Sequence, residues 1–180
     1  TFNIISNYKS KIPIKILKNK FNKGQSYCMY YGAINSDTKT VLFIDADGQN
    51  NPKDIPSLAN IFFNKNVDLV SGIRKKRKDS FIKLISSKIA NKVRQYFLKD
   101  NCEDTGCSLK IMDKTIFIET KFFDGIHRFI PAIYNYYNKK IIYLDVDHRS
   151  RIYGKSKYGT IKRMLNGIID IFKLKYFILK

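Results

Sequence analysis

The sequence is poor in cysteine and has no long apolar run. Its three cysteines, Cys28, Cys102 and Cys107, are odd in number and lack CxxC spacing or a neighbouring histidine, which argues against a disulfide framework and against a zinc site. Reduced, cytosolic thiols are the simpler interpretation. Lys or Asp interrupts every apolar stretch before it reaches the ~20 residues that a bilayer-spanning helix needs. If the protein meets a membrane, we expect it to lie on the surface.

Acidic residues are also scarce. The chain has 15 Asp and Glu against 34 Lys and Arg, a formal net charge of +19, which is more than solubility requires and points to a polyanionic partner. Nucleic acid, anionic lipid and phosphorylated substrates all qualify. Part of the excess reflects a composition rich in Lys, Asn and Ile along the whole chain, so charge alone does not select among these partners.

The sequence lacks an initiator methionine and a secretory leader. Its first six residues have the composition of a strand, so we expect the chain to begin inside a domain. The length of 180 residues fits one domain, and 44% hydrophobic residues with 14% aromatics suffice for a substantial core.

Apolar and β-branched runs alternate with helix-like stretches. Strands are predicted at residues 3–6, 12–17, 40–44, 67–71, 107–111 and 141–146, and helices at residues 25–34, 52–63, 80–98 and 127–137. This alternation is typical of an α/β domain with a mostly parallel sheet flanked by helices.

Two predicted helices are basic and amphipathic. The first has an apolar stripe of Phe81, Ile85, Ile89, Val93 and Phe97, with Lys83, Lys88, Lys92 and Arg94 on other faces; the second has a stripe of Ile161, Leu165, Ile168, Phe172 and Tyr176, flanked by Lys and Arg. Each is either an ordinary helix packed on the sheet or a helix in the membrane interface. The basic run at residues 74–78 precedes the first of them, a position that favours a clamp for anionic head groups and phosphate over a solvated run or a nucleic-acid patch.

The most informative segment runs from Val41 to Pro52, with the sequence VLFIDADGQNNP. An apolar strand ends directly in Asp45 and Asp47, and a glycine, a glutamine and a helix-opening proline follow. Ligands bind at the C-terminal edge of parallel strands. Carboxylate and amide oxygens suit Mg²⁺ or Mn²⁺, which commonly complete their shell with substrate phosphates. The segment therefore predicts a divalent-metal site formed by Asp45, Asp47 and Gln49.

This segment resembles the Asp-x-Asp-x-Gln motif of the inverting family-2 glycosyltransferases, specifically their dolichyl-phosphate mannosyltransferase-like branch. Further segments resemble motifs of that branch: residues 22–26 with Gly32; residues 72–74 with Lys83, Ser87 and Asn91; residues 104–107; and residues 151–159. The matches follow the order of the family along residues 22–159, which single chance matches would not do.

The resemblance implies the GT-A fold of nucleotide-diphospho-sugar transferases, with Mg²⁺ or Mn²⁺ as cofactor. It also implies three sets of site residues: Asp45, Asp47 and Gln49 for the metal and catalysis; Arg151, Ser156 and Lys157 for the donor diphosphate; Arg74, Lys83 and Ser87 for the acceptor phosphate. Lys83 stands where the branch usually has arginine, so a point charge replaces a bidentate fork. The first nucleotide-binding strand of the fold is expected before residue 1.

A lipid phosphate acceptor fits the scarcity of histidine. The chain has only His127 and His148, and a lipid phosphate, whose second pKa is about 6, is largely deprotonated at neutral pH and needs no general base. His127 with Arg128 is more typical of a helix cap and packing pair than of a catalytic dyad. Asp104 fits either a place near the acceptor or a turn before Thr-Gly.

We therefore expect a catalytic domain over residues 1–159, without its first nucleotide-binding strand, and a basic amphipathic helix over residues 160–180. The expected reaction is transfer of a sugar from a nucleotide-diphosphate sugar to a polyprenyl phosphate, at the cytoplasmic face of a membrane with an anionic surface. One alternative is a family-2 transferase with a hydroxyl acceptor, against which the basic acceptor segment argues. The other is a nucleic-acid-binding domain, which leaves the two carboxylates at a strand end unexplained.

Overall fold

Within the part of the chain that the computed structural model describes, which is residues 2–74, 91–149, 167 and 169–176, four strands form one sheet in the order β1-β3-β2-β4. The strands are β1 (Thr40–Phe43), β2 (Leu69–Arg74), β3 (Lys110–Asp113) and β4 (Ile141–Val146). The predicted strands at residues 40–44 and 141–146 are confirmed, and those predicted at residues 67–71 and 107–111 lie slightly later, in β2 and β3.

The sheet is mixed, because β3 is inserted between β1 and β2 and runs antiparallel to both. β2 and β4 pair in parallel. Thus β1, β2 and β4 run in one direction, but two of the three strand pairings in the described sheet are antiparallel. The expectation of a mostly parallel sheet was therefore wrong for this part of the chain. Apolar periodicity reports which residues are buried but not the direction in which a strand enters the sheet. As a consequence β3 begins at the edge where the other strands end.

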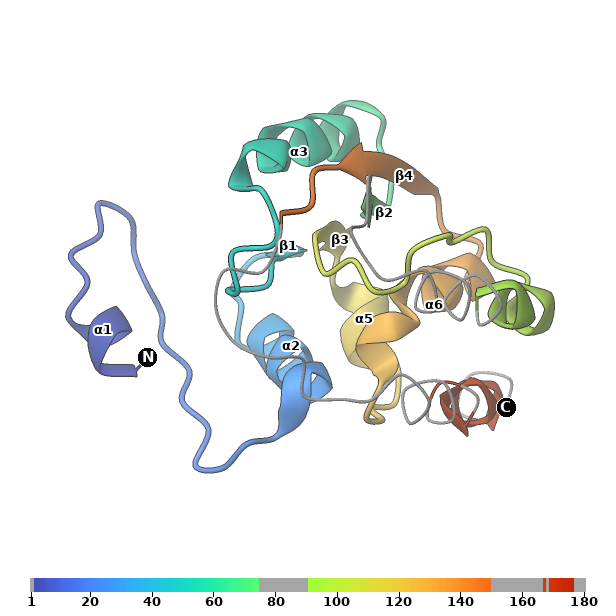
Figure 1. The fold of residues 1–180 in the computed structure, drawn as a ribbon, viewed down its shortest axis with the longest axis horizontal. Helices are drawn as coiled ribbons and strands as arrows, with labels where there is room; N and C mark the ends of the chain where they lie inside the picture. The colour runs from blue at the N-terminus through green and yellow to red at the C-terminus, as the bar shows by residue number, and fades with distance from the viewer. Residues whose placement is uncertain (1, 75–90, 150–166, 168, 177–180) are drawn as a thin grey trace.

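Helices cover both faces of the sheet (Figure 1). One face carries α3 (Ile55–Asn64), which follows the 3₁₀ turn η1 (Pro52–Asp54); the other carries α2 (Gly24–Ile34), α5 (Thr115–Glu119), the turn η2 (Ile126–Arg128) and α6 (Ile130–Tyr136). Strand residues alternate between the two cores, as the period of a strand requires: Val70 packs with α3, and its neighbour Leu69 with the opposite layer.

The first 23 residues contradict the sequence prediction. Residues 2–6 form a short helix, α1 (Phe2–Ser6), and residues 12–17 form no strand. In Figure 1 α1 stands apart from the sheet, and the side chains of residues 2–18 are exposed. A strand is stabilised by pairing with a neighbour, and neither segment has a strand beside it here, so β propensity alone does not decide its conformation.

The two amphipathic helices are described over residues 91–98 and 169–176. The second packs on the core through Ile171 and Leu174, whereas Phe172 and Tyr176, from the predicted stripe, are exposed. The first buries Arg94, which the sequence analysis placed on a charged outer face; its guanidinium pairs with Asp100 at 3.0 Å. The stripe residues Phe81, Ile85, Ile89, Ile161, Leu165 and Ile168 lie outside the described residues.

Candidate active site

Polar residues gather at the edge of the sheet where β1, β2 and β4 end and β3 begins. Asp45 follows β1, Arg74 is the last residue of β2, and His148 follows β4. Ser108 lies just before β3, because β3 starts at this edge. Four segments that are distant in sequence thus meet at the edge where the sequence predicts the ligand site.

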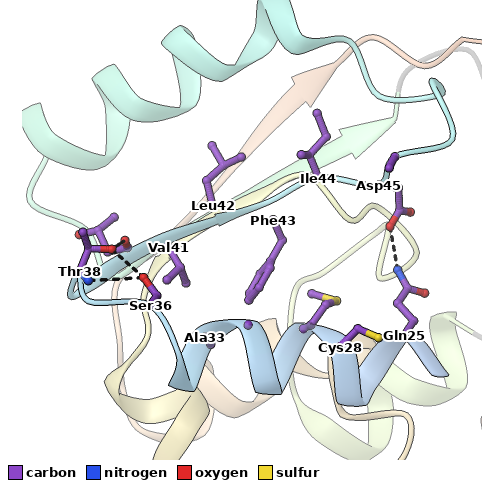
Figure 2. Close-up of a pocket in the computed structure, with 14 residues that line it drawn as sticks. Gln25, Cys28, Ala33, Ser36, Thr38, Val41, Leu42, Phe43, Ile44 and Asp45 are labelled. Atoms are coloured by element: carbon purple, nitrogen blue, oxygen red, sulfur yellow. Dashed lines mark hydrogen bonds between the residues drawn. The ribbon is translucent and has the colours of Figure 1, made fainter. Parts of the chain in front are cut away.

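The loop after β1 carries the three predicted metal ligands, Asp45, Asp47 and Gln49. Gln25, from α2, donates its side-chain amide to Oδ1 of Asp45 at 2.9 Å (Figure 2). Oδ1 of Asp47 accepts from the backbone N–H of Gln49 at 3.1 Å, which closes a tight turn. Gly48, inside this turn, has φ +76°, a left-handed conformation that glycine adopts without strain. The turn therefore holds Asp47 close to the strand end.

The side chain of Gln49 points toward the segment after β4. Its Nε2 lies 3.4 Å from both Nε2 of His148 and the backbone oxygen of Arg149. The backbone N–H of Arg149 in turn donates to the backbone oxygen of Gln49 at 2.9 Å. Gln49 thus connects the loop over residues 45–50, called the metal loop below, to residues 148 and 149 after β4. The sequence did not reveal this contact, because the residues are about a hundred positions apart.

The donor set fits a hard divalent ion that also binds substrate. The described residues contain no cluster of three or more His, Cys, Asp or Glu side chains that would enclose a metal. Asp45 and Asp47 supply two partly exposed carboxylates. Mg²⁺ and Mn²⁺ are commonly bound by one or two carboxylates, with water and phosphate oxygens in the remaining positions. The arrangement suits an ion that arrives with a diphosphate.

A partly buried ion pair lies at the same edge of the sheet, between Arg74 and Asp104. Nε and Nη2 of Arg74 each donate to a different oxygen of Asp104 at 2.7 Å, and the backbone N–H of Arg74 donates to Oδ2 at 3.1 Å. A Cβ on Gly106 would lie 2.7 Å from Nη2 of Arg74, so glycine leaves room for the guanidinium. The two placements that the sequence left open for Asp104 are compatible, because its backbone oxygen also accepts from Cys107 in a turn.

The remaining predicted phosphate ligands lie outside the described residues. These are Lys83, Ser87, Arg151, Ser156 and Lys157. Asn91, from the same motif as Lys83, is described, and its side chain donates to the backbone oxygen of Glu103 at 2.7 Å. This bond therefore anchors the helix over residues 91–98 to the loop that contains Asp104.

Lys110 is a charged residue of this region that the sequence analysis did not single out. It is fully buried at the start of β3, and its Nζ donates to the backbone oxygen of Cys107. Burial lowers the pKa of Lys110 and raises that of the Cys107 thiol. Lys110 therefore helps to hold the loop that contains Asp104. A lysine in an apolar strand gave no sign of this role.

His127 is a partly buried, neutral side chain at the junction of α2 and η2. Its Nδ1 lies 2.7 Å from Oγ of Ser26, which also accepts from the backbone N–H of Gly125 at 2.7 Å. Burial, together with the neighbouring Arg128, lowers the pKa of His127 to about 3. Arg128 pairs with Asp170. The packing interpretation of the His127–Arg128 pair agrees with these contacts.

A groove of about 530 Å³ runs between α2 and β1 and reaches Asp45 (Figure 2). Its walls include Cys28, Met29 and Phe43. β1 is the edge strand of the described sheet, so the groove follows an unpaired strand edge. All three cysteines are free thiols, as expected, and Cys28 alone among them is exposed.

Comparisons with known proteins agree with this architecture. Residues 1–121 match the family described as glycosyl transferase family 2. The chain is 34% identical over 169 residues to dodecaprenyl-phosphate galacturonate synthase of Rhizobium johnstonii, covering 92% of this chain and 50% of that protein. It is 30% identical over 158 residues to undecaprenyl-phosphate 4-deoxy-4-formamido-L-arabinose transferase of Aeromonas hydrophila, covering 88% and 48%. The chain thus spans about half the length of the curated relatives it matches.

A solved structure shows the same fold. Glucosyl-3-phosphoglycerate synthase from Mycobacterium tuberculosis, in complex with Mn²⁺, UDP-glucose and phosphoglyceric acid, superposes with a TM-score of 0.60 at 10% identity, over 89% of this chain and 56% of that one. The α/β, GT-A fold expected from the sequence is therefore confirmed.

Proposed function

Because the chain belongs to glycosyl transferase family 2, we propose that the full-length protein transfers a sugar from a nucleotide-diphosphate sugar to a polyprenyl phosphate, with inversion and with a divalent metal ion. The names of the curated relatives support this acceptor class. The observation that carries the proposal is the Arg74–Asp104 pair, at the same edge of the sheet as Asp45 and Asp47.

The pair favours a phosphate acceptor over a hydroxyl acceptor. A hydroxyl must lose its proton to a general base, and a carboxylate at the acceptor side would be the natural candidate. Both oxygens of Asp104 accept bonds from the guanidinium of Arg74, so the oxygens that a general base would use are occupied. A phosphate acceptor is already an anion, and the cationic side of the pair would attract it.

We assign the donor side to the loop after β1. Asp45 and Asp47 would hold the metal ion, which would neutralise the negative charge that develops on the leaving diphosphate. Gln49 would orient the loop through residues 148 and 149. Arg149 lies against this loop, and this supports a donor-diphosphate role for Arg151, Ser156 and Lys157, which follow shortly in the chain.

We further propose contact with an anionic membrane surface, at its cytoplasmic face, through a patch of four aromatic residues on helices 91–98 and 169–176. The patch consists of Tyr96, Phe97, Phe172 and Tyr176, all exposed. Phe97 and Phe172 lie 6.5 Å apart, and the Lys175 ammonium lies 5.0 Å from the Phe97 ring centroid. Aromatic rings beside lysines suit the boundary between head groups and acyl chains. In the described residues no helix is long and apolar enough to cross a bilayer.

The proposal is tested by release of nucleoside diphosphate from the full-length protein. We expect release to require Mn²⁺ or Mg²⁺ and a polyprenyl phosphate, and to fail with the unphosphorylated polyprenol. Asp47→Ala should abolish release and metal-dependent nucleotide binding by calorimetry, because its carboxylate lies at the strand end and not in the core. Asp37→Ala is the matched control, since Asp37 is exposed in the turn before β1. Equal release with the polyprenol would exclude the phosphate acceptor, and metal-independent binding would exclude the role of Asp47.

A further inference from the structure

Asn50 occupies the point where three strand ends meet. It lies at the end of the metal loop, is only 5% exposed, and forms an antiparallel bridge with His148. Its side-chain oxygen accepts from the backbone N–H of Asp45 at 3.3 Å and from the hydroxyl of Ser108 at 2.8 Å. Its side chain therefore joins the end of β1 to the segment before β3, and its backbone pairs with the segment after β4.

The bond to Asp45 fixes the first metal ligand. The loop leaves β1 at Asp45 and is closed on itself when Asn50 accepts from the Asp45 backbone. Gln25 holds Oδ1 of the same carboxylate from the other side. A residue restrained at its backbone and at its carboxylate has little freedom to turn, which is what a ligand with demanding geometry requires.

The bond to Ser108 couples this loop to the acceptor side. Ser108 is buried and belongs to the segment that also contains Asp104, the partner of Arg74. A shift of the segment before β3 would therefore move Asp45 as well, because Oδ1 of Asn50 accepts from both segments. The spacing between the metal loop and the Arg74–Asp104 pair depends on this link.

We infer that Asn50 is a positioning residue, which holds Asp45 for metal binding and sets the metal loop against the Arg74–Asp104 pair. The inference rests on the proposed metal role of Asp45 and Asp47. Asn50 acts only through its two hydrogen bonds, so a side chain that keeps the acceptor oxygen should keep the function. Asn50→Asp keeps that oxygen and Asn50→Ala removes it.

The neighbouring Asn51 provides a matched control. Its side chain caps η1 by accepting from the backbone N–H of Lys53 at 3.2 Å and bonds to Asp147 and Arg149. Loss of a helix cap lowers stability. Asn51→Ala should therefore affect stability while it leaves both hydrogen bonds of the Asn50 side chain in place.

The experiment measures Mn²⁺ binding to the full-length protein by water-proton relaxation, with thermal unfolding of each variant alongside. We expect Asn50→Ala to weaken Mn²⁺ binding by about 10- to 100-fold, as second-layer residues of metal sites do. Asn50→Asp should retain the affinity, and Asn51→Ala should bind Mn²⁺ like the unchanged protein.

Equal Mn²⁺ affinity in folded Asn50→Ala and the unchanged protein would overturn the inference, as would a loss in Asn50→Asp as large as that in Asn50→Ala. If Asn50→Ala does not fold, Ser108→Ala, which removes one of the two bonds, decides: a smaller loss of affinity supports the inference, and unchanged affinity overturns it. If the unchanged protein binds no Mn²⁺, the metal role in the proposed function fails, and the inference fails with it.

Discussion

Asp104 holds the guanidinium of Arg74 in one plane. This orientation sets which N–H groups of Arg74 an anion could bind. Two parallel N–H···O bonds of 2.7 Å and a third from the backbone fix the pair at the end of β2. Bidentate pairs of this kind fix direction as well as distance. In the proposed function, Asp104 therefore acts on the acceptor through Arg74 and not by touching it.

We predict that Asp104→Asn lowers kcat/KM for the polyprenyl phosphate by about 100-fold, the scale expected when a binding group is displaced by about 1 Å. Donor binding, measured by calorimetry, should change little. Asp68→Asn, before the start of β2 at the opposite edge of the sheet, is the control for a lost carboxylate. If donor and acceptor constants fall together in Asp104→Asn, the pair maintains the fold and does not position Arg74 for the acceptor.

His127 makes the stability of the domain sensitive to acid. Its pKa is lowered from 6.5 to about 3 by burial, so between these values the unfolded chain binds a proton that the native state does not. Stability is therefore complete above about pH 6.5 and falls as the pH falls toward 3.

Replacing His127 by Asn should remove this dependence, because an amide does not titrate in this range and its oxygen can accept from Ser26. We predict that the difference in unfolding free energy between pH 7 and pH 5 is smaller by about 2 kcal/mol in His127→Asn. Urea denaturation at the two pH values measures it. If the unfolding free energy changes equally in both proteins between pH 7 and pH 5, the pKa of His127 is not lowered in the native state.

At the scale of elements, the helix over residues 169–176 has one face packed on the core and one face exposed. Leu174, 3% exposed, belongs to the core beneath α5 and α6, whereas Phe172, two residues earlier, is 61% exposed and touches Phe97. One helix can therefore be held by the domain and still offer aromatic side chains to a surface. The alternatives of a packed helix and an interfacial helix, which the sequence left open, are compatible in this geometry.

Substitutions on the two faces should separate stability from lipid binding. We predict that Leu174→Ala destabilises the fold by about 2–5 kcal/mol, whereas Phe172→Glu leaves unfolding nearly unchanged and weakens co-sedimentation with anionic vesicles. Binding of the unchanged protein should decrease with salt, because each lysine near the surface adds about 1 kcal/mol. Undiminished sedimentation of Phe172→Glu would remove the patch from the membrane contact.

At the scale of the whole molecule, the C-terminal helix belongs to the same folding unit as the sheet. Ile171 and Leu174 lie in one apolar cluster with residues of β2, β3, α5 and α6, and Asp170 pairs with Arg128. Residues 169–176 are therefore part of the domain core and not an appended anchor.

We predict that truncation after Gly159 lowers the thermal stability of the chain, because it exposes this cluster and leaves Arg128 without Asp170. Differential scanning calorimetry of the full and truncated chains would show a fall in Tm of several degrees for each kcal/mol lost. A truncated chain with unchanged Tm would restore the two-part division at residue 159 that the sequence suggested.

The sequence by itself determined the α/β class, most of the element positions and the place of Asp45 and Asp47 at a strand end. Apolar runs and turn residues are local signals, and a strand that ends in Asp45 and Asp47 is visible without a partner. The same locality explains the errors at residues 2–17, where β propensity suggested strands that have no neighbour to pair with.

Only the tertiary structure decided the direction of β3, the partner of Arg74 and the side chain that links the loops. Asp104 lies 30 positions from Arg74, and Ser108 lies 58 from Asn50. The packed face of the last helix was likewise settled by contacts with α5 and α6, not by its own periodicity. Sequence patterns report burial and turns, whereas these features depend on contacts between distant segments, which form only when the sheet is assembled.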